Sequence, residues 1–169
     1  MSDFQTELNA HRQAVEVFLG TARRVPASRW GQAGAPGKWS PGQVVEHVTL
    51  AYEVNRGVLH GHSPPMAAPR WIRPVIRRFL LGPVLRHGRF IQGSKSPRAL
   101  RPGPVPAPPE SLLKRLAAAT TAFETDAAAR GSTTMEHPFF GRLPLGDFVR
   151  LQTIHTRHHC EQLNVSGDG

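Results

Sequence analysis

This 169-residue sequence has little cysteine, a long stretch without acidic residues, and no long apolar run. Its only cysteine is Cys160, so no internal disulfide can form, and this fits a reducing cytoplasm. No run of about eighteen apolar residues occurs, which argues against a membrane-spanning helix. Residues 1–4 show no basic segment followed by an apolar stretch, so we expect no secretory signal peptide. Together these absences predict a cytoplasmic protein.

Negative charge is absent between Glu53 and Glu110, where positive charge is abundant. Such a local field attracts anions, so this window is expected either to meet an anionic ligand or to be a connection with solvated arginines. Nucleic acid is the weakest expectation, because the window holds few aromatic residues for base stacking, namely Trp71, Phe79 and Phe90. The basic residues of the window are Arg56, Arg70, Arg73, Arg77, Arg78, Arg86, Arg89, Lys95, Arg98 and Arg101.

What the chain does contain is apolar residues at helical spacing, in four stretches. The length suits one domain over residues 1–169. The first helix is expected from about residue 3 to residue 24 and the third from residue 110 to residue 130, with Gly131 as its stop. The last is expected to begin near Pro144, after a turn through residues 137–141.

The second helix carries its own start signal. Ser40 can cap the first free amides, Pro41 suits the first helical position, and Gln43 can reach back to complete a capping box. Counted at about 100° per residue, the apolar face of this helix includes His47, and Trp39 lies near the mouth of the helix.

Residues 61–109, which we call the basic excursion, separate the second helix from the third. Residues 101–109 are so rich in proline that they are expected to be extended. Residues 71–81 are amphipathic and basic; we expect a short helix that covers the other helices, the alternative being a segment that lies on an anionic membrane surface. The sequence therefore predicts an all-α, four-helix bundle with a long Pro/Arg-rich excursion between helices two and three.

Histidines on two of these helices are candidates for a metal site. His155 and His159 are four residues apart and so lie on one face of the last helix, while His47 faces inward from the second. Three neutral imidazoles would bind a divalent ion such as zinc, nickel or iron and leave positions free for water or substrate. Packing without metal is the competing interpretation. His158 could also pair with His155, but His159 lies on the inward-facing side of the last helix and His158 lies off to one side, which favours His159.

The neighbours of these histidines are expected to play lesser parts. Glu46 and Glu161 are adjacent to predicted ligands and so point about 100° away, which suggests surface or supporting carboxylates. Gln162 faces inward and could bond a ligand ring, with simple packing as the alternative. Cys160 points away from the helix face that carries His155 and His159, so we reject it as a nucleophile. No catalytic acid or base is assigned.

The sequence also resembles a known family over helices one, two and four. The stretches that carry the resemblance are residues 39–48 (WSPGQVVEHV), 137–144 (HPFFGRLP) and 155–163 (HTRHHCEQL). They look like the DinB/YfiT superfamily of metal-binding four-helix proteins; residues 61–109 do not. By motif match, the resemblance implies that one divalent ion is ligated by His47, His155 and His159.

Members that this chain resembles include thiol transferases that use bacillithiol or mycothiol and a mycothiol-dependent isomerase. The resemblance thus implies a metal-dependent enzyme acting on a small molecule, first a low-molecular-weight-thiol S-transferase and second a hydrolase. A different class of function is a non-enzymatic bundle whose basic excursion binds an anionic membrane surface. A third hypothesis is a degenerate member whose histidines persist as packing. An exposed apolar helix face would also allow a homodimer.

Overall fold

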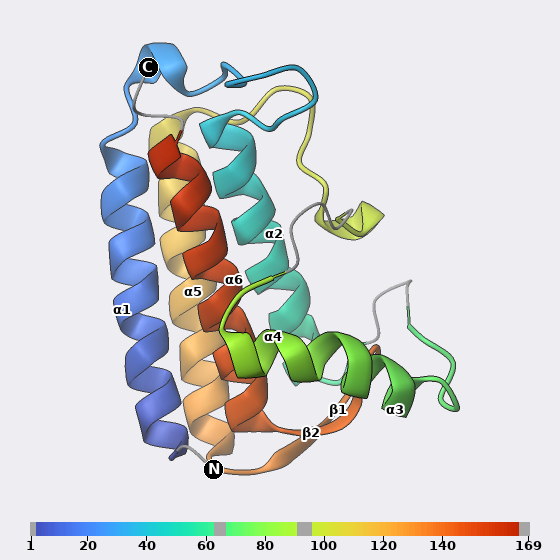
Figure 1. Ribbon diagram of the computed structural model, residues 1–169. Helices are drawn as coiled ribbons and strands as arrows, with labels where there is room; N and C mark the ends of the chain where they lie inside the picture. The colour runs from blue at the N-terminus through green and yellow to red at the C-terminus, as the bar shows by residue number, and fades with distance from the viewer. Residues whose placement is uncertain (1–2, 63–66, 91–95, 166–169) are drawn as a thin grey trace.

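The computed structural model describes residues 3–62, 67–90 and 96–165. It is mainly helical with a small two-stranded sheet, and four long helices lie side by side (Figure 1). Helix α1 packs mainly against α6, and α2 mainly against α5. The long helices are α1 (Phe4–Arg23), α2 (Pro41–Leu59), α5 (Pro109–Arg130) and α6 (Leu145–Val165). The short ones are η1 (Ala27–Arg29), α3 (Arg73–Ile76), η2 (Arg77–Leu81), α4 (Gly82–His87) and η3 (Arg98–Leu100).

The predicted ends of the long helices are confirmed. At the start of α2 the backbone N–H of Gln43 donates to the Ser40 hydroxyl at 3.3 Å, and the Ser40 N–H donates to the Gln43 side-chain oxygen at 3.0 Å. This reciprocal pair is the predicted capping box. At the end of α5, Gly131 has a φ of +63°, which glycine adopts without strain.

The core lies between the long helices. Each of them contributes one fully buried aromatic side chain: Phe18, Tyr52, Phe123 and Phe148. The rings of Phe123 and Phe148 meet edge to face with centroids 5.7 Å apart. Since each helix buries a large side chain against the others, the four helices share one core.

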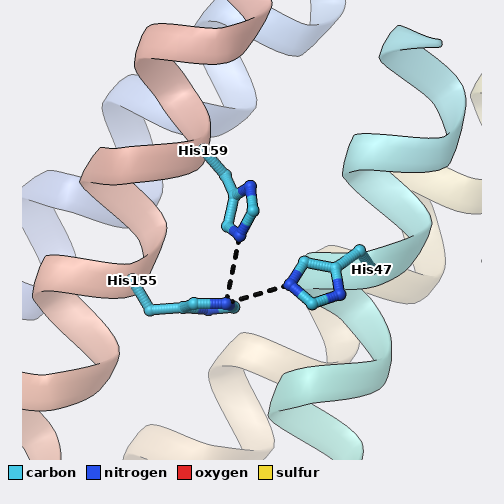
Figure 2. A group of neighbouring side chains, drawn as sticks. All are labelled: His47, His155 and His159. Carbon is cyan, nitrogen blue, oxygen red and sulfur yellow. Dashed lines mark hydrogen bonds between the residues drawn. The ribbon is translucent and has the colours of Figure 1, made fainter. Parts of the chain in front are cut away.

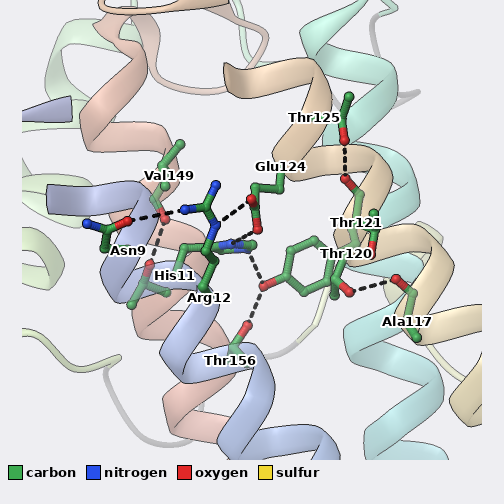
Figure 3. Close-up of polar contacts among 12 residues, drawn as sticks. Asn9, His11, Arg12, Ala117, Thr120, Thr121, Glu124, Thr125, Val149 and Thr156 are labelled. Atoms are coloured by element: carbon green, nitrogen blue, oxygen red, sulfur yellow. Dashed lines mark hydrogen bonds and ion pairs between the residues drawn. The ribbon is translucent and has the colours of Figure 1, made fainter. Parts of the chain in front are cut away.

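A buried chain of polar groups crosses this core (Figure 3). His11 Nε2 of α1 shares a 3.0 Å hydrogen bond with the Tyr52 hydroxyl of α2, which shares a 2.7 Å bond with the Thr156 hydroxyl of α6. Burial lowers the pKa of His11 to about 4, against the opposing effect of Glu124. The ring is therefore neutral at pH 7, and the chain of hydrogen bonds ties three helices together.

The structure adds a small two-stranded sheet to the expected helical fold. Strand β1 (Thr134–His137) pairs antiparallel with β2 (Gly141–Pro144), where the sequence indicated only a turn. The turn is closed by the His137 ring, whose Nδ1 accepts from the N–H groups of Phe139 and Phe140 at 3.1 and 3.2 Å. Burial alternates along both strands, but each has only four residues.

The helical part of the basic excursion forms one continuous segment, residues 73–87, made of α3, η2 and α4; we call it the crossing helix. It runs across the long helices (Figure 1). Leu81 and Val84 pack on Leu151 and Ile154 of α6. A covering helix is thus present as predicted, but it begins at Arg73 rather than at residue 71 and continues to His87 rather than ending at residue 81.

The chain returns from the crossing helix along an extended segment, as expected from its prolines. Gln43 Nε2 donates to the Gly103 carbonyl and Trp30 Nε1 donates to the Ala107 carbonyl, both at 2.9 Å. A Cβ on Gly42 would lie 2.7 Å from the Pro106 Cβ, so only glycine admits this close approach. Residues 103–107 are therefore fixed against the start of α2 and the Trp30 ring. None of the described helices has the length and apolar character needed to cross a membrane.

Candidate metal centre

The three predicted histidines converge, as expected from their helical faces (Figure 2). His47 projects from α2, while His155 and His159 project from successive turns of α6. The Nε2 atom of His155 lies 3.0 Å from Nε2 of His47 and 3.1 Å from Nε2 of His159. The three side chains offer ligand atoms that all lie within 4.8 Å of one another.

Hydrogen bonds outside the cluster orient two of the rings. His47 Nδ1 lies 2.6 Å from the Leu100 carbonyl oxygen, which can only accept, so the ring proton is on Nδ1. His159 Nδ1 lies 2.9 Å from the side-chain oxygen of Gln162 and donates to it in the same way. In both neutral rings the Nε2 lone pair is therefore directed into the cluster, which is how metal-binding histidines are commonly held.

His155 cannot provide a hydrogen-bond donor for every nitrogen lone pair in the cluster. Its Nδ1 is buried and has no hydrogen-bond partner among the described residues, and its Nε2 faces the lone pairs of both other rings. One neutral imidazole carries one proton and so can satisfy only one of these lone pairs well. A cation would satisfy all three. Ligands about 2.0–2.1 Å from a tetrahedral ion lie about 3.3 Å apart, so the observed separations need little adjustment.

Burial keeps the cluster neutral. It lowers the pKa of His47, lowers that of His155 well below its ordinary value, and lowers that of His159 to about 3. The neighbouring imidazoles add to the effect on His155 and His159 because their charged forms would repel. Metal-binding imidazoles must be unprotonated, so protons compete weakly for these nitrogens at pH 7.

Aromatic side chains form the walls of the cluster. The Trp39 ring is tilted against His47 with centroids 4.8 Å apart, and Phe90 meets the edge of His155 at 5.6 Å. His155 is partly exposed, whereas His47 and His159 are buried. The sequence placed Trp39 near this end of α2 but gave no role to Phe90 or Leu100. Leu100 acts through its backbone carbonyl, for which no side-chain signal exists.

His158 lies beside the cluster and does not complete it. Its ring centroid is 5.0 Å from that of His159, but its Nε2 lies 3.3 Å from the amide nitrogen of Gln162. Gln162 therefore links His158 to His159. Of the two expectations for Gln162, a hydrogen bond to a histidine ring is observed rather than simple packing, and its side chain is exposed rather than inward.

The remaining candidates lie outside the cluster. Glu161 is exposed, and Glu46 is half-buried with one carboxylate oxygen that has no hydrogen-bond partner among the described residues. Cys160 is buried, and its Sγ donates to the Thr21 hydroxyl at 3.6 Å. This position against α1 agrees with its rejection as a nucleophile.

Fold and site together define a mainly helical protein with a three-histidine cluster able to hold a metal ion. The chain belongs to the family described as "Protein of unknown function (DUF1569)", which matches residues 19–166 and so includes all three histidines. No curated protein and no solved structure matches the chain.

Proposed function

We propose that this protein is a metal-dependent enzyme that binds a divalent ion, zinc, nickel or iron, through His47, His155 and His159. The observation that carries the proposal is the convergence of three Nε2 atoms, two of them on rings whose Nδ1 protons are engaged elsewhere. We also propose that the four long helices form a bundle of the DinB/YfiT type, which uses histidines at the matching positions.

A metal held by three imidazoles has positions left for a substrate, and it would lower the pKa of a bound thiol or water enough for nucleophilic attack near neutral pH. The chain's own contribution is to hold the imidazoles in their neutral forms and to line the approach with Trp39 and Phe90. Such walls exclude water and suit a substrate with an apolar part.

Our first choice of reaction is transfer of a low-molecular-weight thiol, of the bacillithiol or mycothiol type, to a small electrophile. In this reaction the thiol loses its proton, the carbon–sulfur bond forms, and the leaving group departs with the electrons of the broken bond. Arg98 and Arg101 flank Leu100, whose carbonyl orients His47, and both arginines are exposed. They would attract the carboxylates of an acidic thiol. We place the activity in the cytoplasm, where such thiols are reduced.

The metal content of protein purified without an affinity tag tests the site. We expect one divalent ion per chain, and its loss in His47→Ala, His155→Ala and His159→Ala. His158→Ala is the matched control, because it removes a neighbouring imidazole from the same helix and should retain the ion. Metal-free protein that takes up no ion when zinc, nickel or iron is supplied, and whose unfolding is unchanged by chelator, would show that the histidines only pack.

An activity assay on the metal-loaded protein tests the reaction. Disappearance of a low-molecular-weight thiol in the presence of an epoxide or alkyl halide should require the ion and be lost in the three ligand variants. Metal-dependent cleavage of an ester or amide, without thiol consumption, would show that the enzyme is a hydrolase rather than a thiol transferase. Activity that survives loss of all three imidazoles would refute the proposal.

A further inference from the structure

The crossing helix and the turn that precedes it expose several large apolar side chains. Trp71 is 78% exposed, Val75 52%, Phe79 70% and Leu80 46%. Val75 and Phe79 are four residues apart and so lie on one face of the crossing helix, and Trp71 lies in the turn just before it. The π-helical turn at Arg77–Leu81 widens the spacing, so that Leu81 is buried against α6 while Phe79 and Leu80 remain outside. We call Trp71, Val75, Phe79 and Leu80 the apolar stripe.

Single exposed apolar residues are ordinary, but a contiguous group marks a surface that meets something. The apolar stripe is accompanied by exposed arginines, and the Arg78 guanidinium lies 6.0 Å from the centre of the Phe79 ring. No acidic residue occurs anywhere between Glu53 and Glu110 to oppose them. Residues 70–80 therefore combine aromatic and aliphatic side chains with charges that are all positive.

A cleft of about 820 Å³ beside the crossing helix extends this positive region. Its lining includes six arginines but only two carboxylates, and one of these, Glu136, is paired with Arg73 at 2.9 Å. Arg77 donates to the Arg142 carbonyl, which fixes the crossing helix against β2. No histidine of the metal cluster is among the described residues that line the cleft. The six arginines are Arg70, Arg73, Arg77, Arg78, Arg86 and Arg142.

We propose that the crossing helix docks on an anionic membrane surface. Trp71, Val75 and Phe79 would enter the interface between headgroups and acyl chains, and the arginines that line the cleft would meet lipid phosphates. An amphipathic basic helix with aromatic residues on its apolar face is suited to this position, and guanidinium groups bind phosphate in a bidentate manner. The contact is peripheral, because the stripe lies on the outside of a helix packed on α6.

Charge favours a membrane over a second copy of the chain. A two-fold interface would place the apolar stripe of one chain against that of the other, and would thereby bring both sets of arginines together. An anionic lipid surface instead neutralises them. The apolar stripe is short, so binding needs both its burial and the electrostatic attraction, and neither alone gives stable attachment.

Flotation of the full-length protein with vesicles tests the proposal. We expect binding to vesicles of phosphatidylcholine with phosphatidylglycerol, little binding to phosphatidylcholine alone, and weakening at high salt. The double variant Arg70→Gln with Arg78→Gln should lower the partition coefficient by roughly five-fold for each arginine. Arg23→Gln with Arg130→Gln removes the same charge from the ends of α1 and α5 and should have little effect.

The apolar stripe is tested by Trp71→Ser with Phe79→Ser, which should abolish flotation. Val17→Ser is the matched control, because Val17 is 60% exposed on α1. Trp71 also serves as a probe: its fluorescence should shift to the blue on anionic vesicles and be quenched by brominated acyl chains. Trp30 is only 4% exposed and should not respond.

Three results would overturn the proposal. Equal binding to neutral vesicles would remove the role of the arginines. Binding that depends on the arginines but survives the serine variants would indicate capture of phosphate groups in the cleft alone. Self-association abolished by the serine variants, with no flotation, would show that a second copy covers the stripe. The histidine variants should float normally, so this test is independent of the proposed enzyme.

Discussion

Acid should open the hairpin through His137. The ring of His137 is stacked on Phe140 and is 7% exposed, and its Nδ1 accepts the two hydrogen bonds that close the turn. A proton on Nδ1 would place an N–H against two other N–H groups. Burial lowers the pKa of His137 to about 4, and the charge of Arg73 adds to this effect.

The size and sign of the effect follow from the difference between the folded and unfolded states. The unfolded chain binds a proton at His137 below its ordinary pKa of about 6.5, whereas the folded protein does so only near 4. The contribution of neutral His137 to the free energy of unfolding is therefore complete above about pH 6.5 and is lost as the pH falls towards 4. The free energy of unfolding should fall through this residue by about 2 kcal/mol at pH 5 and by about 3 kcal/mol at pH 4.

The free energy of unfolding, measured with urea between pH 7.5 and pH 4, tests this reasoning against His137→Asn. An asparagine oxygen can accept the N–H two residues ahead, as in an Asx turn, but does not titrate. The variant should be less stable at pH 7.5, because it loses the packing of the ring, and the difference from the natural protein should shrink by about 3 kcal/mol by pH 4. His11 and the three-histidine cluster are the same in both proteins, so their effects cancel when both proteins are measured in chelator. A difference that stays constant over this pH range would refute the assigned role of His137.

Three further changes have expected outcomes in urea unfolding at pH 7.5. Gly42→Ala should destabilise the fold by about 1–3 kcal/mol, because the new Cβ would overlap the rigid Pro106 ring; an unchanged midpoint would contradict the close approach. Ser40→Ala should cost about 1 kcal/mol through loss of the helix cap, and Ser40→Asp should restore most of it. Tyr52→Phe should cost about 1–3 kcal/mol, because it leaves His11 Nε2 buried without its partner, and a cost near zero would show that the buried chain of hydrogen bonds is dispensable.

The helices were predictable because their signals are local. The capping box at Ser40 and the stop at Gly131 lie within a few residues of the ends that they define, and the structure confirms both. The turn at residues 137–141 was expected, but the strands on either side of it were missed. Each has only four residues, which is the shortest length over which an alternating pattern indicates a strand.

The candidate metal centre was predictable in part. Helical periodicity places His155 and His159 on one face, and directs His47 inward from another helix. It gave no information on the Leu100 carbonyl, which lies 53 residues along the chain from the histidine that it orients. That contact depends on the path by which the basic excursion returns to α2. The proline content predicts that this part of the chain is extended, but it does not predict where the chain runs.

The amino-acid sequence by itself determined the long helices, their caps, and the faces on which the histidines lie, because these follow from short-range backbone geometry. Only the tertiary structure decided that His47 meets His155 across a separation of 108 residues, and that the apolar stripe is left exposed. Both depend on how the helices pack, and the packing is fixed by the shapes of many buried side chains acting together rather than by any local pattern.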